Sequence, residues 1–452
     1  MIIYPPEIQF HDDLLRVSSR FTTEKQDAHL WFEVDKKYAD YVMTDKIDAF
    51  LVGLLPLAMR LGEDIHLKHP VSEKMYFNVS NNMVALINDA FPEFKRISVF
   101  ADGFADESKV IKGKVVAVGL SCGTDSLCTI ADNSSSDIPG SYRITHGVFT
   151  NVGSHGSTDD AAGKERFLGR LENAKGCASE LGLEFVVIDS NMEQILSSVT
   201  DYDRTSTFRN ISAVLILEKL FFRYFLSSGL AYRDLKVRKG NSSTFVRGRD
   251  SAGFDPITLP CLSTSALEFI SYGSQYKRTE KTAIVSDFEP SYRWLNVCAA
   301  QSKNCSVCRK CVRTLLTLDL LGKVERYEAV FDLDKYRREK RGFICFILAT
   351  KKTSSINREV AELMTEVDYH PPLSFYPYFA GYWLGFKTIV AGRKTLDAVD
   401  KRLQALPRMR ASKMLGPLRF ALYAFIKIED HRTDLPLIDS LQSSSYKKEI
   451  PK

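Results

Sequence analysis

The sequence predicts an α/β fold in which a parallel sheet carries helices on both faces. A β-branched apolar run places one strand near 114–120, and small and hydroxyl residues follow it at 119–126. Strand-like and helix-like segments then alternate as far as residue 330, with further strands expected at 143–150 and 184–189. Such alternation is typical of a parallel sheet, in which ligands bind at the carboxyl ends of the strands.

The chain of 452 residues is too long for one compact domain, and the sequence divides into three predicted regions. Residues 1–111 are expected to form a separate α+β module, residues 112–330 the α/β domain, and residues 331–452 a mainly helical extension. Within the first region, strands are expected at 14–21, 30–34 and 96–100, and helices at 45–61, with Thr44 as its cap, and 84–91.

The C-terminal part combines apolar helices with a basic segment. A helix at 314–321 is expected to end at Gly322, and apolar runs at 374–386 and 418–426 predict helices that pack together or against a partner. A solvated helix face is favoured for the basic segment over docking to nucleic acid or an acidic protein. Its cations are Arg393, Lys394, Lys401, Arg402, Arg408, Arg410 and Lys413.

Composition narrows the classes of function. The net charge of +5 is mild, so composition requires neither a nucleic acid nor a membrane partner. Apolar stretches end at a charge before they reach the length of a membrane span. Nine cysteines, four of them clustered, and prolines at positions 5 and 6 where a secretory signal would be apolar favour a reducing cytoplasm.

The turn at 119–126 carries the chemistry expected of an anion site. It reads Gly-Leu-Ser-Cys-Gly-Thr-Asp-Ser and opens an expected helix. A helix start directs free backbone N–H groups and the positive end of the helix dipole at an anion. Asp125 in this turn is placed to bind a Mg²⁺ ion that bridges phosphates. A strand-to-helix turn without a nucleotide is the alternative interpretation.

A second motif has the spacing C-x6-C-x2-C-x2-C and consists of Cys298, Cys305, Cys308 and Cys311. Four thiolates in fourteen residues can close a tetrahedral Zn²⁺ site, in which the metal stabilises a knuckle too small to form its own core. Zinc is favoured over an iron–sulfur cluster and over disulfides, which need an oxidising compartment. A metal site with four protein ligands is more often structural than catalytic.

The order Ser-Cys-Gly-Thr-Asp-Ser at 121–126 resembles the SGGxDS signature of the PP-loop ATP pyrophosphatases, with Cys122 where that family usually has glycine. The pair of motifs, about 170 residues apart, is similar to that of the 7-cyano-7-deazaguanine synthases (QueC) and their relatives. Segments at 207–210 and 279–284 resemble the family's Arg-Asn motif and its lysine-bearing segment. The resemblance covers roughly residues 112–325 and implies a PP-loop (HUP-type) sheet with added terminal regions.

This resemblance implies an ATP-dependent C–N ligase that forms AMP and pyrophosphate, with ATP, Mg²⁺ and Zn²⁺ as cofactors. A small-molecule carboxylate, 7-carboxy-7-deazaguanine or a relative, would be adenylated and passed to ammonia or to an amine of a protein acceptor. The protein acceptor is suggested because QueC-like proteins occur in bacterial antiviral defence operons.

The resemblance also implies which residues act. Asp125 would hold Mg²⁺, and Arg209, Lys281 and Arg278 would neutralise the developing charge. His155, in the loop after the second strand of the α/β domain, either contacts a ligand or has no role. The implied contacts to ATP are Leu120, Ser121, Cys122, Gly123, Thr124, Asp125, Ser126 and Asp189.

Three other interpretations stay open at this point. A PP-loop amidotransferase or ligase could act on a sugar or another metabolite. A tRNA-thiolating enzyme would need affinity for RNA, which the basic C-terminal segment could supply. A nucleotide-binding regulator without catalysis is the third. Each of them is compatible with an oligomer.

Overall fold

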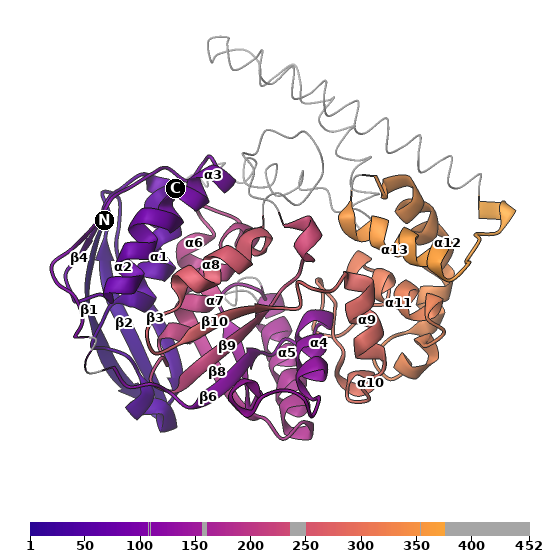
Figure 1. Cartoon of the computed structure of the whole chain (residues 1–452), viewed down its shortest axis with the longest axis horizontal. Coiled ribbons are helices and arrows are strands. Elements are labelled where there is room, and N and C mark those ends of the chain that lie inside the picture. Colours follow the sequence, from indigo (N-terminus) through magenta and orange to yellow (C-terminus); the bar gives the residue numbers. More distant parts are fainter. Residues whose placement is uncertain (107, 109, 156–160, 236–249, 353, 376–452) are drawn as a thin grey trace, which may run out of the picture.

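The computed structural model describes residues 1–375 except 107, 109, 156–160, 236–249 and 353, and it is built on one ten-stranded sheet (Figure 1). The strand order is β10-β9-β6-β7-β8-β3-β2-β1-β4-β5. The strands are β1 (Ile2–His11), β2 (Leu14–Thr22), β3 (Asp27–Asp35), β4 (Ile65–Leu67), β5 (Val99–Ala101), β6 (Val115–Gly119), β7 (His146–Asn151), β8 (Glu184–Ser190), β9 (Phe221–Ser227) and β10 (Glu268–Tyr272).

Helices cover both faces of the sheet, and the last three form a group beside it (Figure 1). They are α1 (Asp48–Leu61), α2 (Glu73–Asn78), α3 (Val84–Ala90), α4 (Thr124–Asn133), α5 (Ala161–Glu180), α6 (Met192–Leu196), α7 (Ser206–Leu215), α8 (Asp255–Leu262), α9 (Arg278–Ser286), α10 (Ser291–Trp294), α11 (Arg309–Leu320), α12 (Leu333–Thr350) and α13 (Ser355–Glu366). Within the described part of the chain, no helix is long and apolar enough to cross a membrane.

Five neighbouring strands, β10-β9-β6-β7-β8, are parallel. The predicted α/β architecture is confirmed here, because β6, β7 and β8 match the strands expected near 114–120, 143–150 and 184–189. Numbered along the chain, this part has the spatial order 3-2-1-4-5, so the order reverses between β6 and β9. Parallel sheets bind ligands outside the carboxyl ends of the strands at such a reversal.

The N-terminal strands continue this sheet. β3 pairs antiparallel to β8 through Phe32 opposite Ser190 and Glu33 opposite Asp189. The strands predicted at 14–21 and 30–34 are present as β2 and β3, and β1 precedes them. The sheet therefore continues across residue 111, the boundary expected between the N-terminal α+β module and the α/β domain.

Helix α1 begins three residues later than expected. Its first residue is Asp48, and Ile47 occupies the capping position, so Thr44 is not the cap. The expected end is confirmed, because Gly62 follows the helix with a φ of +78°. Close packing with α7 explains the glycine within α1: a Cβ on Gly53 would lie 2.6 Å from the Ser212 side-chain oxygen.

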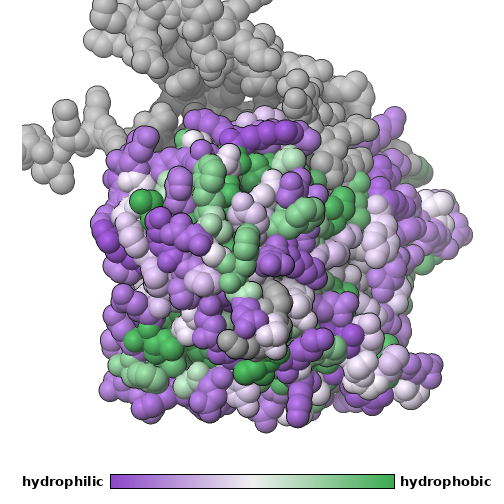
Figure 2. All heavy atoms as spheres, turned by 60° about the vertical axis from the view of Figure 1, so that its left-hand side comes forward, coloured by the Kyte–Doolittle hydropathy of each residue, from purple (hydrophilic) through white to green (hydrophobic). Residues whose placement is uncertain are grey.

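The apolar side chains form two large clusters. One combines the N-terminal region with α7 and α8, and the other lies around α4, α5, α11, α12 and α13. Figure 2 shows the N-terminal side from outside, where hydrophobic side chains form small patches among hydrophilic ones. Gly322 follows α11 with a φ of +71°, which matches the predicted end of that helix.

The expectations for the far C-terminus are not tested by the structure. The apolar run at 374–386 beyond residue 375, the run at 418–426 and the basic segment between them lie outside the described residues. The described part of the C-terminal region, α12 and α13, is helical as predicted and packs against α11.

A buried ion pair joins the N-terminal region to the α/β core. Lys46 is 5% exposed, and its Nζ lies 2.7 Å from Glu218 and 3.4 Å from Asp48, both almost fully buried. Replacing Lys46 by methionine should lower the free energy of unfolding by about 3–5 kcal/mol, because it leaves two buried carboxylates without their cation. Denaturant unfolding measures this loss.

The matched control is Lys68→Met, because Lys68 pairs with Asp102 at 3.0 Å but both side chains are about half exposed. Such a surface pair contributes at most about 1 kcal/mol. Equal losses for the two variants would contradict the tight coupling of the N-terminal region to the core.

Asp255, at the start of α8, is a buried carboxyl group that is 2% exposed. Burial raises the pKa of Asp255 from 3.8 to about 7; the Thr207 hydroxyl, which donates to it at 2.6 Å, lowers the pKa, and Asp250 raises it. The folded chain thus keeps a proton that the unfolded chain loses near pH 4.

We expect this proton to make the protein less stable as the pH rises from about 4 to about 7, by at most about 1.4 kcal/mol per pH unit, with no further loss above that range. Asp255→Asn is neutral at every pH and should remove this part of the slope. Denaturant midpoints of both proteins at several pH values give the comparison, and parallel curves would show that Asp255 is ionised in the folded chain.

Candidate functional site

The loop at 121–126 runs from the end of β6 into the first three residues of α4, at the reversal of strand order. The Ser121 side chain accepts a hydrogen bond from the Gly123 N–H at 3.3 Å, and the Ser126 hydroxyl donates to the Gly123 carbonyl at 3.2 Å. The two serine oxygens are 3.3 Å apart. Helix geometry leaves the amides of the first turn of α4 without partners inside the helix. The loop therefore presents N–H and O–H donors at the end of the sheet.

Cys122 keeps the backbone shape that glycine would allow. Its φ is +56°, in the left-handed region, and its side chain is fully buried. The Sγ atom lies 3.9 Å from the Asn173 carbonyl of α5, while the Cys122 carbonyl accepts the Asn296 N–H at 2.8 Å. The thiol pKa is raised by the neighbouring Cys177 and by burial. Cys122 is thus a packing residue of the loop and not a nucleophile at neutral pH.

Asp125 lies between two cations. Its Oδ2 is 2.7 Å from Arg278 Nη1 and its Oδ1 is 3.2 Å from Lys281 Nζ. Burial alone would raise the pKa of Asp125, but Arg278 and Lys281 outweigh burial and bring the pKa below its ordinary value. The carboxylate is therefore ionised at neutral pH.

Lys281 belongs to α9 and reaches back to the end of β9. It is 1% exposed, and its Nζ donates to the Ser228 carbonyl at 2.5 Å. The hydroxyl of Thr129 in α4 lies 2.8 Å from that of Ser227, so α4 also contacts the end of β9. We call Ser121, Asp125, Ser126, Arg278 and Lys281 the strand-end site.

The strand-end site combines donors with positive charge. Two cations contact the Asp125 carboxylate, and two hydroxyls and the first amides of α4 belong to the same loop and helix start. Such a set favours an anion such as a phosphate group, for which helix amides and a basic side chain are suited. Asp125 offers the kind of oxygen ligand that Mg²⁺ prefers. In the structure its two oxygens contact the side chains of Arg278 and Lys281.

Arg209 donates its hydrogen bonds to residues outside this set. It is fully buried in the first turn of α7, where it donates to Thr205 at 2.8 Å, to the Val152 carbonyl at 2.9 Å and to Glu193 at 2.5 Å. Its Nη2 has no hydrogen-bond partner among the described residues. In the structure Arg209 supports the backbone after β7 through the Val152 carbonyl, and its predicted role in neutralising charge stays a prediction.

Asp189, at the end of β8, accepts hydrogen bonds from the Asn151 side chain at 2.7 Å and from the Ser190 N–H at 2.8 Å. Burial raises the pKa of its carboxyl. Asp189 lines a hollow of about 280 Å³ with residues of β3 and α5, among them Glu33 and Phe167. It lies at the strand ends as predicted, two strands away from β6.

His155 is 6% exposed and stacks on Phe149 with ring centroids 5.0 Å apart. Burial and the nearby cations, Arg170 before Arg166, lower its pKa to about 4. The ring is therefore neutral at physiological pH and packed against the sheet. His155 is a buried ring in the loop after β7, an arrangement that the sequence did not indicate.

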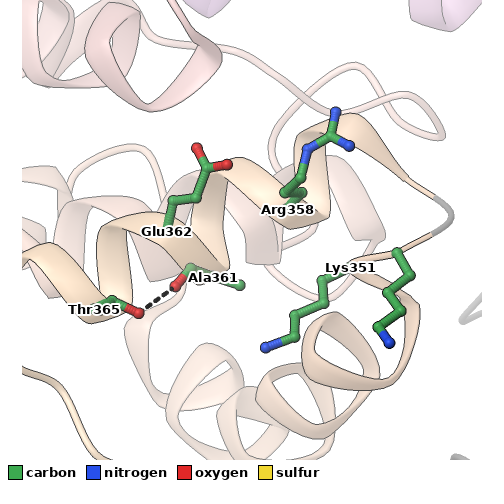
Figure 3. Close-up of a pocket in the computed structure, with 6 residues that line it drawn as sticks. Lys351, Arg358, Ala361, Glu362 and Thr365 are labelled. Carbon is green, nitrogen blue, oxygen red and sulfur yellow. Dashed lines mark hydrogen bonds between the residues drawn. The ribbon is translucent and has the colours of Figure 1, made fainter.

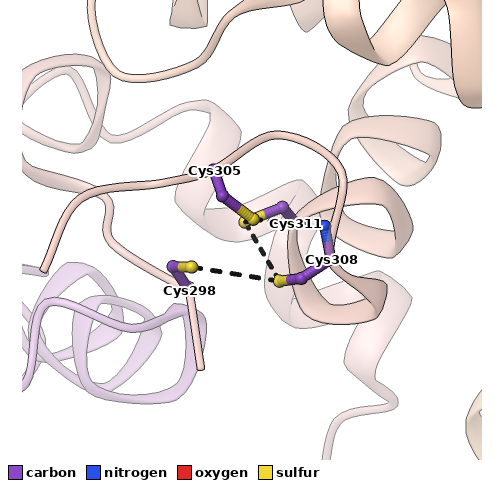
Figure 4. A group of neighbouring side chains, drawn as sticks. All are labelled: Cys298, Cys305, Cys308 and Cys311. Carbon is purple, nitrogen blue, oxygen red and sulfur yellow. Dashed lines mark hydrogen bonds between the residues drawn. The ribbon is translucent and has the colours of Figure 1, made fainter. Parts of the chain in front are cut away.

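The four cysteines come together at the start of α11 (Figure 4). Sulfur distances are 4.0 Å for Cys298–Cys308, 3.9 Å for Cys305–Cys311 and 3.5 Å for Cys308–Cys311, and all four atoms lie within 4.8 Å of one another. Tetrahedral Zn–S bonds of about 2.3 Å place sulfurs about 3.8 Å apart. The group could hold a zinc ion.

The cysteine group is connected to the loop at 121–126. Asn296, two residues before Cys298, donates its N–H to the Cys122 carbonyl at 2.8 Å. Arg170 of α5 donates to the Cys298 carbonyl at 2.7 Å, and the Asn304 side chain donates to the Leu295 carbonyl at 2.7 Å. Sequence reasoning missed these residues because an isolated asparagine or arginine gives no local signal. The segment that leads into the cysteine group thus holds the backbone of the loop at 121–126 in place.

A larger hollow of about 440 Å³ lies beside α13 and the turn that follows α12 (Figure 3). Its lining includes Lys351, Lys352 and Arg358 beside Glu362. The lysines are exposed side chains at the end of α12. The strand-end site differs from this hollow in that a carboxylate is held between two cations beside the start of a helix.

Two predicted groups of residues are therefore brought together by the fold, the loop with Asp125, Lys281 and Arg278, and the four cysteines. Arg209 and Asp189 lie outside the strand-end site as defined above. Comparisons of the chain with protein-family models, curated proteins and solved structures find no match.

Proposed function

We propose that the chain is an ATP-dependent ligase of the PP-loop type that adenylates a carboxylate and releases pyrophosphate. One observation carries this proposal: a strand-to-helix loop of hydroxyl and small residues lies at the reversal of strand order, with Asp125 between Arg278 and Lys281. The spatial order 3-2-1-4-5 of the parallel strands is in keeping with a nucleotide at this position.

The donors of the strand-end site suit the departing phosphates. The α4 amides and the Ser121 and Ser126 hydroxyls would bind the β- and γ-phosphates of ATP. Asp125 would hold Mg²⁺, which supplies charge neutralisation to the phosphates when bound. Arg278 and Lys281 would stabilise the charge that develops on pyrophosphate as it leaves.

The proposed reaction has two steps. A carboxylate oxygen of the substrate attacks the α-phosphorus of ATP, a new O–P bond forms, and the bond to the β-phosphate oxygen breaks to release pyrophosphate. An amine nitrogen then attacks the acyl carbon of the adenylate, AMP leaves with the former carboxylate oxygen, and the nitrogen loses a proton. Neither step needs a nucleophile from the protein.

The four cysteines are proposed to hold a structural zinc ion. Sulfur distances near those of a tetrahedral ZnS₄ site support a single ion more than a larger iron–sulfur cluster, whose thiolates bind different iron atoms. Because the Asn296 N–H donates to the Cys122 carbonyl, zinc at the cysteines would also help to order the loop at 121–126.

The proposed substrate rests on sequence resemblance to the 7-cyano-7-deazaguanine synthases. It is 7-carboxy-7-deazaguanine or a relative, with ammonia or a protein amine as acceptor, the latter in keeping with a role in bacterial antiviral defence. In this account the N-terminal strands and the C-terminal helices, which extend beyond the 112–325 region of resemblance, adapt the core to its acceptor.

The test is to incubate the full chain with ATP, Mg²⁺ and 7-carboxy-7-deazaguanine, with and without ammonium, and to follow AMP, pyrophosphate and product mass. We expect AMP and pyrophosphate in equal amounts and only when the carboxylate is present. ADP and phosphate as products would overturn the proposed chemistry. An absence of AMP would reject this carboxylate, and strongly salt-dependent RNA binding would then favour a tRNA substrate.

A further inference from the structure

Arg278 links the strand-end site to the C-terminal helices through its two ends. Its guanidinium lies 2.7 Å from Asp125 Oδ2, and its backbone N–H donates to Glu359 Oε2 at 2.7 Å. Glu359 belongs to α13, eighty-one residues further along the chain. One residue therefore contacts the carboxylate of the phosphate loop on one side and a carboxylate of the C-terminal region on the other.

Glu359 suits the position that it occupies. Arg278 is the first residue of α9, so its N–H has no acceptor inside the helix. A carboxylate at a helix N-terminus satisfies such a group and interacts favourably with the helix dipole. Glu359 is 3% exposed, and its other oxygen lies 3.4 Å from Arg233 Nη2. Water therefore cannot readily replace it.

Neighbouring ion pairs link three segments: the chain after β9, the start of α9 and helix α13. Glu362 lies 3.3 Å from Arg233 and 3.5 Å from Lys277, the residue before α9. Arg358 lies 3.3 Å from Asp234, and it projects from the same side of α13 as Glu362 (Figure 3). Helix α13 thus contacts both the segment after β9 and the start of α9.

We infer that Glu359 is a positioning residue that fixes the start of α9, so that the Arg278 guanidinium meets Asp125. The C-terminal helices then support the strand-end site through Arg278, although none of the residues that define the site lies in them. The consequence for ATP chemistry rests on the proposed function, whereas the positioning itself is a property of the protein without ligand.

The experiment is a set of double-mutant cycles on the full chain without ligand. Asp125→Asn is combined with Glu359→Ala, with Glu359→Gln, which keeps an oxygen acceptor for the Arg278 N–H, and with Glu366→Ala. The last is the control, because Glu366 lies on the same helix, is 60% exposed and approaches only to 3.8 Å of Lys277. Residues that share a partner give non-additive effects, and independent residues give additive ones.

We expect Asp125→Asn to shift the melting temperature at most half as far in the Glu359→Ala background as in the parent. The Glu366→Ala background should show the full shift, and the Glu359→Gln background most of it. If Glu359→Ala does not fold, Glu359→Asp, one methylene shorter, gives the same comparison. Equal shifts in every background would overturn the inference. A parent that Asp125→Asn leaves unchanged would also overturn it, because the Arg278–Asp125 pair would then have no weight.

Pyrophosphate release measured in parallel separates the two proposals. Non-additive melting with no ATP-dependent pyrophosphate from the parent protein would leave the positioning role standing and overturn the proposed function. Additive shifts in melting temperature, together with pyrophosphate release by the parent protein, would overturn the positioning role and leave the proposed function standing. If both hold, Glu359→Ala should reduce kcat for pyrophosphate release at least about tenfold, and Glu359→Gln should recover most of it.

Discussion

Replacing Asp125 by asparagine is expected to reduce carboxylate-dependent pyrophosphate release at least about 100-fold. The substitution keeps the size of the side chain but removes the charge that lies 2.7 Å from Arg278 and 3.2 Å from Lys281. Both cations would lose their common partner, and Mg²⁺ would lose a carboxylate ligand. Steady-state assays with ATP, Mg²⁺ and 7-carboxy-7-deazaguanine measure the change.

The control for this variant is Asp137→Asn, in the exposed turn after α4, where the Asp137 carboxylate accepts a hydrogen bond from the Ser136 hydroxyl at 3.4 Å. It removes the same charge without touching the strand-end site and should leave turnover unchanged. An Asp125→Asn protein that folds normally and releases pyrophosphate at the parent rate would reject the role of Asp125.

Loss of metal from the cysteine group should be the largest single effect on stability. Cys308→Ser is expected to abolish stoichiometric zinc and to lower the melting temperature by more than about 10 °C, because structural zinc contributes on the order of 10 kcal/mol to the folding of small metal-bound units. The strand-end site should be disturbed as well, since Asn296 beside this group holds the Cys122 carbonyl. Metal analysis and thermal melts measure both effects.

Cys261→Ser is the matched control, because this half-buried thiol lies outside the four-cysteine group. We expect it to keep zinc and to melt within a few degrees of the parent. Stoichiometric iron in place of zinc in the parent would contradict the assignment of the metal, and a Cys308→Ser protein with full zinc and a normal melt would contradict the role of the thiolate.

The sequence predicted the parts of the molecule that local pattern determines. β6 and the start of α4 follow from a β-branched run that ends in small residues, and the cysteine group follows from its spacing. Lys281, which resemblance and the need for positive charge indicated as a site residue, lies 3.2 Å from Asp125. The sequence did not show how Cys122 fits where the resembling family has glycine. The structure gives the answer, because Cys122 adopts the left-handed φ of +56° that glycine allows.

Other features depend on contacts between distant parts of the chain, and no local pattern could indicate them. The pairing of Phe32 with Ser190 makes the N-terminal strands part of the main sheet. β1 contains two prolines, which argue against a strand, and it tolerates them with a register shift between Ile3 and Pro6. The burial of Arg209 against Glu193 is likewise invisible in a sequence, where a cation reads as a surface residue.

The central claim, attack of a carboxylate on the α-phosphate, is tested most directly with 7-carboxy-7-deazaguanine labelled with ¹⁸O in its carboxylate. Mass spectrometry of the nucleotide formed with ATP, Mg²⁺ and ammonium measures the label. We expect AMP that carries one ¹⁸O atom from the substrate, because the bridging oxygen of the acyl-adenylate leaves with AMP. Unlabelled AMP, or ADP as the nucleotide product, would contradict adenylation of the carboxylate.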